Sequence, residues 1–399
     1  MADDEAREDV MTGELHRRRL ATTLNRSYEV VLSENLLGGD AASPLSSALG
    51  PRSALLVTTP TVMTLYGRRA TVALRRAGLR VDTLVLPCSE RSKTPMQVMR
   101  VCRAALRHRL DRSAVLVALG GGVCMDIVTM AASSIRRGIG CIRIPTTLIG
   151  QIDAALGAKG AVNYLGHKSY IGCFYPPEIT LLDPAALRTL PNRHLRSGLA
   201  EMIKIALVRD AHLFHLVEAH ASRFIASGFQ VPRAASREAL WRAASAMLAE
   251  LEPNLYENVT HKRFVDMGHI FSPLIESASR FEITHGEAVA IDLALSASLA
   301  GVMGWLANRE CARIVRALAG SGLPVSSPFL TRRLCLEALA EAGRHHRHLV
   351  LPTGIGQVAF VEDDGCASPA LLDAALDRLE ALASELEPPD IAHAIGAHA

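Results

Sequence analysis

Short, almost wholly apolar runs alternate with helix-like segments through the first half of the chain. These runs lie at residues 28–32, 54–58, 81–86, 114–119, 141–144 and 179–182. Strands this apolar are buried on both faces, as happens in a parallel sheet that helices cover on each side. The alternation therefore predicts an α/β domain.

The sequence changes character after Pro191. Long amphipathic stretches rich in Ala, Leu, Glu and Arg replace the apolar runs, and strand signals become few. Such stretches are typical of helices that bury one face. We therefore predict three parts: a flexible leader over residues 1–26, an α/β domain over 27–187 and an all-α domain over 188–399.

Composition excludes several classes of protein. In a chain of 399 residues, Lys and Arg are interleaved with Asp and Glu to a net charge of only +3, which argues against a nucleic-acid binder. We find no signal-peptide pattern and no apolar run long enough for a membrane span, so we expect a cytoplasmic protein without membrane contact. The eight cysteines are scattered without zinc-site spacing and are expected to be free thiols.

A glycine triplet, Gly120 to Gly122, lies between the predicted strand 114–119 and a helix-like segment. Glycines at such a turn let the backbone approach a pyrophosphate, and the free N–H groups of the following helix favour an anion. A tight turn without a ligand is the plainer alternative. The next predicted strand ends in Thr146 and Thr147, whose hydroxyls would lie at the same edge of the sheet. Together the two strand ends favour a dinucleotide site.

Charged residues interrupt apolar surroundings further along the chain. Asp153, Lys159 and Lys168 occupy glycine-containing segments, and the two lysines suit an anionic substrate, although each alone is more often a surface charge. Glu201 and Lys204 are three residues apart and share one face of a predicted helix. Their burial requires a ligand, a metal or their own ion pair to satisfy both charges.

Two histidines, His269 and His285, each lie beside a glycine and are sixteen residues apart. A histidine in an apolar setting is usually a hydrogen-bonded core residue. Together with Glu201, however, these two offer the two nitrogens and one carboxylate that a catalytic zinc favours, with positions left for substrate oxygens. The pattern thus indicates a metal site as an alternative to core packing.

The order of several short motifs resembles a known family. The chain carries GGGV, PTT, KSYIG, GLAE and HGEAVAI in succession between about residues 50 and 360. This succession resembles the 3-dehydroquinate synthase superfamily of sugar phosphate cyclases. The resemblance implies a Rossmann-like N-terminal domain that binds NAD⁺, a helical C-terminal domain that binds a divalent metal (zinc or cobalt), an active site between them, and a homodimer.

The same resemblance implies roles for individual residues. Its metal ligands would be Glu201, His269 and His285, and the groups that hold and process the substrate would be Asp153, Lys159 and Lys204. Arg137 matches an arginine that reaches the substrate phosphate of the neighbouring subunit, which would make the dimer necessary for function. The positions that match NAD⁺ contacts are Glu90, Lys93, Gly121, Gly122, Val123, Asp126, Thr146, Thr147, Lys168 and Thr189.

Departures from the dehydroquinate synthase pattern are informative. Such an enzyme would show Asn at Asp266, a second His at Pro273 and Arg at Lys262, so several groups that recognise a carboxylated substrate are missing. The chain is instead similar to 2-epi-5-epi-valiolone synthases, which cyclise sedoheptulose 7-phosphate. In that subgroup Asp266, Lys262 and His345 match positions at the substrate.

We therefore expect a phosphate-eliminating cyclase, a lyase of C7-cyclitol biosynthesis that binds a small sugar phosphate. Two enzymatic alternatives are a true 3-dehydroquinate synthase and a cyclase that makes a related cyclitol precursor. A metal-dependent polyol dehydrogenase is a third alternative from another class, because such enzymes share this two-domain architecture.

Overall fold

A six-stranded sheet forms the centre of the N-terminal half in the computed structural model, which describes residues 26–34, 36, 50–344, 348–362 and 368–386. All of its neighbouring strands are parallel. The order across the sheet is β1 (Glu29–Leu32), β8 (Ile179–Leu182), β5 (Gly140–Pro145), β4 (Val115–Gly120), β2 (Ser53–Thr58) and β3 (Arg80–Val85). The six predicted strands and the parallel α/β arrangement are thus confirmed.

Alternate residues of β4 face opposite sides of the sheet. Leu116 and Ala118 pack in one apolar cluster with α3 (Pro95–Arg107) and α4 (Gly122–Ser134), whereas Val117 packs in a second cluster on the α2 side. Every residue of β4 is buried. Burial on both faces explains why this strand is apolar throughout. Helix α2 (Arg68–Arg76) and the short α1 (Pro60–Val62) precede β3.

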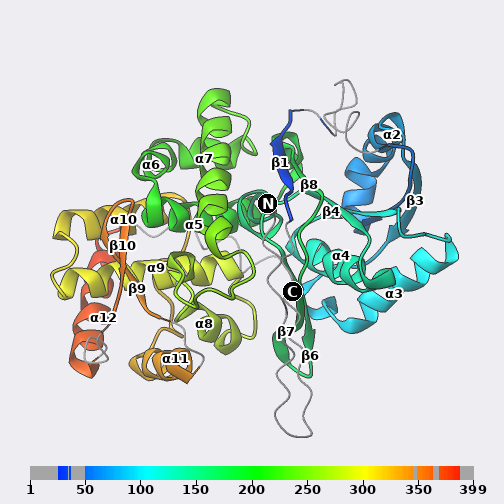
Figure 1. The fold of residues 1–399 in the computed structure, drawn as a ribbon. Helices are drawn as coiled ribbons and strands as arrows, with labels where there is room; N and C mark the ends of the chain where they lie inside the picture. The colour runs from blue at the N-terminus through cyan, green and yellow to red at the C-terminus, as the bar shows by residue number, and fades with distance from the viewer. Residues whose placement is uncertain (1–25, 35, 37–49, 345–347, 363–367, 387–399) are drawn as a thin grey trace, which may run out of the picture.

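A hairpin of β6 (Lys159–Tyr164) and β7 (His167–Phe174) leaves the sheet domain at its border with the helical one (Figure 1). The hairpin packs closely on α4, because a Cβ on Gly160 would lie 2.6 Å from the Cγ2 of Thr129. The sequence pattern did not indicate these strands, since most of β7 is polar or exposed. Their position places Lys159 and Lys168 opposite the helical domain.

The C-terminal half is helical, as predicted. Its central helix, α9 (His285–Val302), is buried along almost its whole length and packs against α5, α8, α10 and α12. One addition to the predicted all-α domain is the hairpin of β9 (Val350–Gly354) and β10 (Gln357–Phe360), strands too short to give a clear sequence pattern. The other helices are α5 (Asn192–Arg209), α6 (Ala211–Ala226), α7 (Arg233–Leu251), α8 (Ser272–Ala278), α10 (Asn308–Gly320), α11 (Arg332–Arg344) and α12 (Pro369–Ser384).

The two halves share apolar packing at their junction. The turn of π-helix Gly150–Ala154 follows β5, yet its Ile152 is buried in the core of the helical domain. This insertion holds Asp153 between the halves. The predicted boundary at residues 187 and 188 falls within the 3₁₀ helix Pro184–Thr189, which connects β8 to α5.

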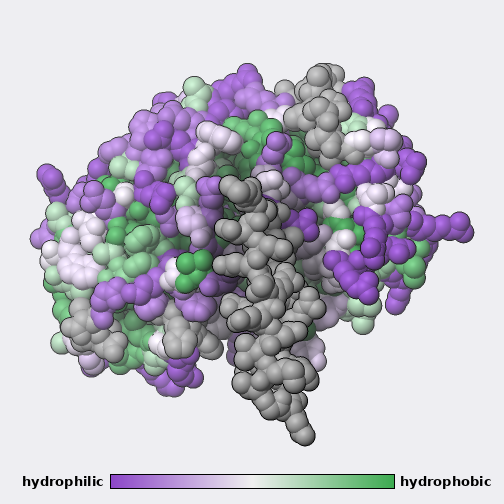
Figure 2. All heavy atoms as spheres, in the orientation of Figure 1, coloured by the Kyte–Doolittle hydropathy of each residue, from purple (hydrophilic) through white to green (hydrophobic). Residues whose placement is uncertain are grey.

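The surface is mainly hydrophilic on the face drawn in Figure 2, with apolar areas interspersed over the helical half. Among the described helices, none combines the length and the apolar character that a bilayer crossing requires. The cysteines within the described residues are all free, as expected.

Candidate metal centre and substrate cavity

One carboxylate and two imidazoles from distant parts of the chain converge in the helical half. Glu201 lies on α5, His269 precedes α8, and His285 is the first residue of α9. The Oε1 atom of Glu201 is 3.1 Å from Nε2 of His285 and 3.8 Å from Nε2 of His269. One ligand atom from each residue lies within 4.8 Å of the others. The predicted convergence of these three residues is therefore present.

The hydrogen bonds of the two rings fix which nitrogen is available to a metal. Nδ1 of His285 lies 2.9 Å from Oε1 of Glu276, and Nδ1 of His269 lies 3.2 Å from the carbonyl oxygen of Met267. Each Nδ1 thus donates its hydrogen to an oxygen, and each Nε2 faces Glu201. A histidine ligand held by an acceptor at its other nitrogen is the usual arrangement at protein metal sites. Glu201, His269 and His285 therefore fit a divalent cation such as zinc.

The two histidines differ in pKa when no metal is bound. Burial, with the nearby Lys204 cation, lowers the pKa of His269 to about 3. Burial also acts to lower the pKa of His285, but hydrogen bonds to Glu201 and Glu276 outweigh it and raise that pKa to about 9. The metal-free protein therefore holds a second proton on His285, which a cation at Nε2 would displace.

Two glycines allow the helices that carry these ligands to pack closely on their neighbours. A Cβ on Gly198 would lie 2.5 Å from the Cβ of Leu148, and a Cβ on Gly286 would lie 2.2 Å from the carbonyl oxygen of Ser197. The Gly286 N–H also donates to Oγ of Ser197 at 3.0 Å. Only glycine fits at these contacts. The contact at Gly286 brings the start of α9 against α5 and so places His285 beside Glu201, and the contact at Gly198 brings α5 against the segment that follows β5.

The segment after His269 is held by a buried carboxylate that the sequence analysis did not single out. Asp292 on α9 accepts hydrogen bonds from the backbone N–H groups of Phe271 at 2.6 Å and Ser272 at 2.9 Å. Burial raises the pKa of Asp292 to about 6, although these hydrogen bonds oppose the rise. The His269 loop is therefore fixed to the same helix that supplies His285.

A cavity of about 570 Å³ lies between the two halves next to this centre. Its walls come from the Asp153 turn, the β6–β7 hairpin, α5, α7 and the 3₁₀ helix Phe264–Asp266. A cavity of this size fits a small, polar metabolite. Its charged residues and one histidine are Asp126, Asp153, Lys159, Lys204, Glu257, Arg263, Asp266 and His269.

Buried cations and carboxylates alternate at the inner end of the cavity. Lys204 pairs with Oε2 of Glu201 at 2.5 Å, and neither side chain is more than 3% exposed. Burial acts to lower the pKa of Lys204, but Glu201 and Asp153 outweigh it and raise the pKa. Burial raises the pKa of Asp153, with Lys204 opposing the rise. Lys204 and Asp153 thus lie next to the metal centre and line the cavity.

A second charged network lines the outer part of the cavity. Arg263 pairs with Glu257 and with Asp266, and Glu257 also pairs with Lys159. Burial and the neighbouring Arg263 cation lower the pKa of Lys159 to about 8. Lys159 therefore stays mostly protonated at neutral pH but releases its proton more readily than an ordinary lysine.

The glycine turn and the Thr146–Thr147 strand end meet at one edge of the sheet. The N–H of Thr146 donates to the carbonyl oxygen of Gly120 at 2.8 Å, and a Cβ on Gly121 would lie 3.0 Å from Cγ2 of Thr147. Gly121 is the N-cap of α4, and Gly122 begins that helix. The half-buried Val123 follows in the same first turn. This is the strand-edge arrangement that the sequence predicted for a dinucleotide.

The remaining positions that match NAD⁺ contacts are more widely placed. Lys93 is buried and pairs with Asp126 at 2.6 Å, where burial raises the pKa of the carboxyl. Glu90 accepts hydrogen bonds from Asn163 of β6 through its carbonyl and Oε1 atoms. Thr189 bonds to the hydroxyl of Tyr66, at 2.6 Å.

Among the described residues, two with predicted substrate roles, Arg137 and Lys262, do not line this cavity in a single chain. Arg137 is exposed on the 3₁₀ helix Ile135–Arg137, with a φ of 69°. Lys262 pairs with Glu362 at 2.7 Å, so its ammonium group is directed to β10, while the adjacent Arg263 lines the cavity. His345 lies outside the described residues.

Arg263, Glu257 and Glu276 are site residues that were not predicted from the sequence. Arg263 is adjacent to Lys262, and Glu257 lies nine residues before Asp266, so a scan of every charge close to Asp266 along the chain could have included them. Glu276 lies nine residues before His285. Its contact with that ring depends on how α8 packs on α9, which no local pattern indicates.

Comparison with known proteins agrees with this geometry. The family described as 3-dehydroquinate synthase N-terminal matches residues 83–197, and the family described as 3-dehydroquinate synthase C-terminal matches residues 198–345. The chain is 41% identical over 358 residues to a 2-epi-5-epi-valiolone synthase of Streptomyces hygroscopicus subsp. jinggangensis, covering 86% of each chain. It is 37% identical over 315 residues to a 3-dehydroquinate synthase of a Synechococcus species, covering 77% of this chain and 84% of the relative.

A solved structure is similar over nearly the whole length. The Streptomyces 2-epi-5-epi-valiolone synthase with NAD⁺ and Zn²⁺ bound superposes with a TM-score of 0.84 at 40% identity, covering 91% of this chain and 99% of that one. The resemblance inferred from the motifs is confirmed by both family matches and by this identity. The chain therefore belongs to the 3-dehydroquinate synthase family of sugar phosphate cyclases.

Proposed function

We propose that this protein is a cyclase that converts sedoheptulose 7-phosphate to 2-epi-5-epi-valiolone, or a closely related C7 cyclitol, with release of phosphate. The observation that carries the proposal is the opening of the Glu201, His269 and His285 centre onto a cavity lined by Lys159, Lys204 and Asp266. A 2-epi-5-epi-valiolone synthase at 41% identity supports the substrate class. As part of this proposal the enzyme is a cytoplasmic carbon–oxygen lyase that acts as a homodimer.

Two cofactors complete the proposal. A relative of 40% identity carries NAD⁺ and Zn²⁺, and the donor set in this chain suits zinc or cobalt. When bound, NAD⁺ would accept and return a hydride while the divalent cation polarised a substrate oxygen. The turn at Gly121 and the strand end at Thr146 would receive the dinucleotide, together with the other positions named above for NAD⁺.

The cations of the cavity account for binding and departure of the phosphate. Lys159 and Lys204 approach the cavity from opposite domains, so a phosphate between them would meet positive charge on two sides. In the proposed dimer, Arg137 would add a third cation from a second copy of the chain. Lys159, with a pKa of about 8, could also supply a proton to the departing group.

Asp266 accounts for the preference for a neutral sugar over a carboxylated one. Its side chain is 12% exposed and lines the cavity, where it would accept hydrogen bonds from hydroxyls and repel a substrate carboxylate. Arg263 holds Asp266 through two hydrogen bonds, one of them 3.2 Å long from its Nε atom. The acceptor is therefore fixed in orientation before a substrate arrives.

A 3-dehydroquinate synthase remains the second candidate, because a Synechococcus enzyme of that activity is 37% identical. The test is incubation with NAD⁺ and zinc and either sedoheptulose 7-phosphate or the seven-carbon shikimate precursor, with phosphate, NADH and product measured. We expect phosphate release from sedoheptulose 7-phosphate without accumulation of NADH. Turnover of the shikimate precursor alone would favour the second candidate, and steady accumulation of NADH would indicate a polyol dehydrogenase.

A further inference from the structure

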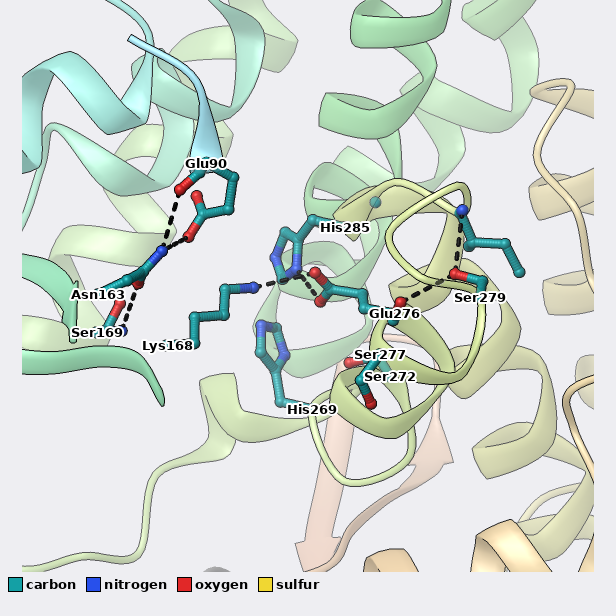
Figure 3. Close-up of polar contacts among 12 residues, drawn as sticks. Glu90, Asn163, Lys168, Ser169, His269, Ser272, Glu276, Ser277, Ser279 and His285 are labelled. Carbon is teal, nitrogen blue, oxygen red and sulfur yellow. Dashed lines mark hydrogen bonds and ion pairs between the residues drawn. The ribbon is translucent and has the colours of Figure 1, made fainter. Parts of the chain in front are cut away.

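A lysine of the sheet domain reaches a carboxylate that supports the metal centre of the helical domain. Nζ of Lys168, on β7, lies 3.0 Å from Oε2 of Glu276 on α8. The other oxygen of the same carboxylate, Oε1, accepts the hydrogen bond from Nδ1 of His285. Figure 3 shows the Lys168 side chain and the His285 ring both directed at the carboxylate of Glu276. One carboxylate thus joins the two domains at a metal ligand.

The backbone around Lys168 is fixed to the dinucleotide side of the molecule. The N–H of Ser169 donates to Oδ1 of Asn163 at 2.7 Å, and Lys93 donates to Oγ of Ser169 at 3.2 Å. Asn163 in turn donates to Glu90, as Figure 3 also shows. The backbone of Lys168 is therefore fixed within the sheet domain. Its contact with Glu276 depends on how the two domains are docked.

Burial makes this pair different from an ordinary surface ion pair. The Glu276 side chain is only 8% exposed, although the Lys168 side chain is 48% exposed. A buried carboxylate needs a partner at each oxygen, and here one partner comes from each domain. Exposed ion pairs contribute little to stability because water competes for both charges. Water has little access to the Glu276 carboxylate, so it competes less at this pair. Loss of Lys168 would leave one oxygen of Glu276 without its partner and free the carboxylate to turn away from His285.

We propose that Lys168 and Glu276 are positioning residues that make the affinity of the metal centre depend on docking of the two domains. Glu276 orients the ring of His285, and Lys168 holds Glu276 only while β7 faces α8. The metal centre would then be complete only when the sheet domain is seated against it. This inference rests on the metal site of the proposed function and assigns to Lys168 a role separate from any contact with NAD⁺.

The experiment measures zinc affinity of the purified full-length protein without NAD⁺ or substrate, by competition with a chromophoric chelator. The Glu276→Gln variant should bind zinc about 10–100-fold more weakly, as is typical when the partner of a histidine ligand is lost. Lys168→Met should weaken zinc binding by a smaller factor, about 3–10-fold, because it acts through Glu276. The double variant should bind zinc no more weakly than Glu276→Gln alone, since the two residues act in series.

A matched control separates this effect from general loosening of the domains. Glu34, next to β1, also links the halves by pairing with Arg233 and Arg237 of α7, on a part of the molecule without metal ligands. Glu34→Gln should leave zinc affinity within about twofold of the parent protein. An equal loss of zinc affinity in Glu34→Gln would overturn the proposal, as would unchanged affinity in Lys168→Met or additive losses in the double variant.

The outcome is distinguishable from failure of the proposed function, because zinc affinity is read without turnover. Zinc binding that requires His269 and weakens in Lys168→Met would support the coupling even if the protein releases no phosphate from sedoheptulose 7-phosphate. That second result would contradict only the proposed reaction. Lys168→Met that weakens only NAD⁺ binding, measured by calorimetry on the same preparations, would show a cofactor contact and contradict the coupling.

Discussion

Gly286 packs against Ser197 so closely that a Cβ on the glycine would lie 2.2 Å from the serine carbonyl oxygen. This contact joins the start of α9 to the first half of α5, and it places His285 beside Glu201. The metal centre is therefore built by backbone approach as much as by the ligands themselves. Gly286, which follows the ligand His285, is therefore needed for close packing and not for backbone flexibility.

Gly286→Ala should consequently destabilise the protein and weaken the metal centre together. The added methyl group meets backbone atoms that cannot turn aside, so we expect a loss of about 1–3 kcal/mol in the free energy of unfolding. Chemical denaturation and zinc retention on gel filtration would measure both effects. Gly343→Ala is the matched control, because nothing lies within 4 Å of its Cβ position in α11. Equal stability in the two variants would contradict this account.

His269→Ala should remove both turnover and tight metal binding. Loss of one of three ligands is expected to lower zinc affinity by at least ~100-fold, which corresponds to about 3 kcal/mol. Metal content after dialysis and phosphate release would be measured on the same sample. The exposed His261 serves as the comparison, since His261→Ala should keep metal and activity. Full metal content in His269→Ala would remove this residue from the ligand set.

Asp266→Asn should impair the sugar substrate most. The change removes a charged acceptor that Arg263 holds at the cavity wall, and hydrogen bonds to charged groups contribute about 1.5–3 kcal/mol. We therefore expect kcat/KM for sedoheptulose 7-phosphate to fall by about 10–100-fold. The ratio of kcat/KM for the shikimate precursor to kcat/KM for sedoheptulose 7-phosphate should rise. An unaffected rate would discredit the selectivity role of Asp266.

Lys159 should give the reaction a basic limit. Its pKa is lowered to about 8 by burial and by Arg263, so the ammonium form that attracts phosphate is present below pH 8 and is lost as pH rises through that value. The kcat/KM profile, which reports ionisation of the free enzyme, should fall above about pH 8. Lys159→Arg should move this fall to higher pH, because the guanidinium stays charged. An identical profile in that variant would assign the limit to another group.

The strands of the sheet were predictable because their environment is uniform. β4 is buried on both faces, so all of its residues are apolar and the run indicates a strand inside the sheet. The β6–β7 hairpin was not predictable, since it is largely exposed and its place is set by the contact of Gly160 with Thr129. Local pattern thus indicated the elements of the domain core and missed those positioned only by tertiary packing.

The candidate site shows the same division. The metal ligands could be predicted because a metal requires particular residue types, here Glu201, His269 and His285. The structure brings these three residues together, as predicted. The choice between Lys262 and Arg263 as the residue that lines the cavity could not be read from the chain. It depends on the stacking of Phe264 on Phe360, with ring centroids 4.6 Å apart, beside which Lys262 turns towards β10.

Anomalous scattering at the zinc edge, from crystals grown with zinc, would locate the cation in this protein. We expect one strong peak per chain between Oε1 of Glu201 and the Nε2 atoms of His269 and His285, next to the cavity that Lys159 lines. A zinc peak at any other site, or none at these three residues in crystals that hold zinc elsewhere, would contradict this expectation.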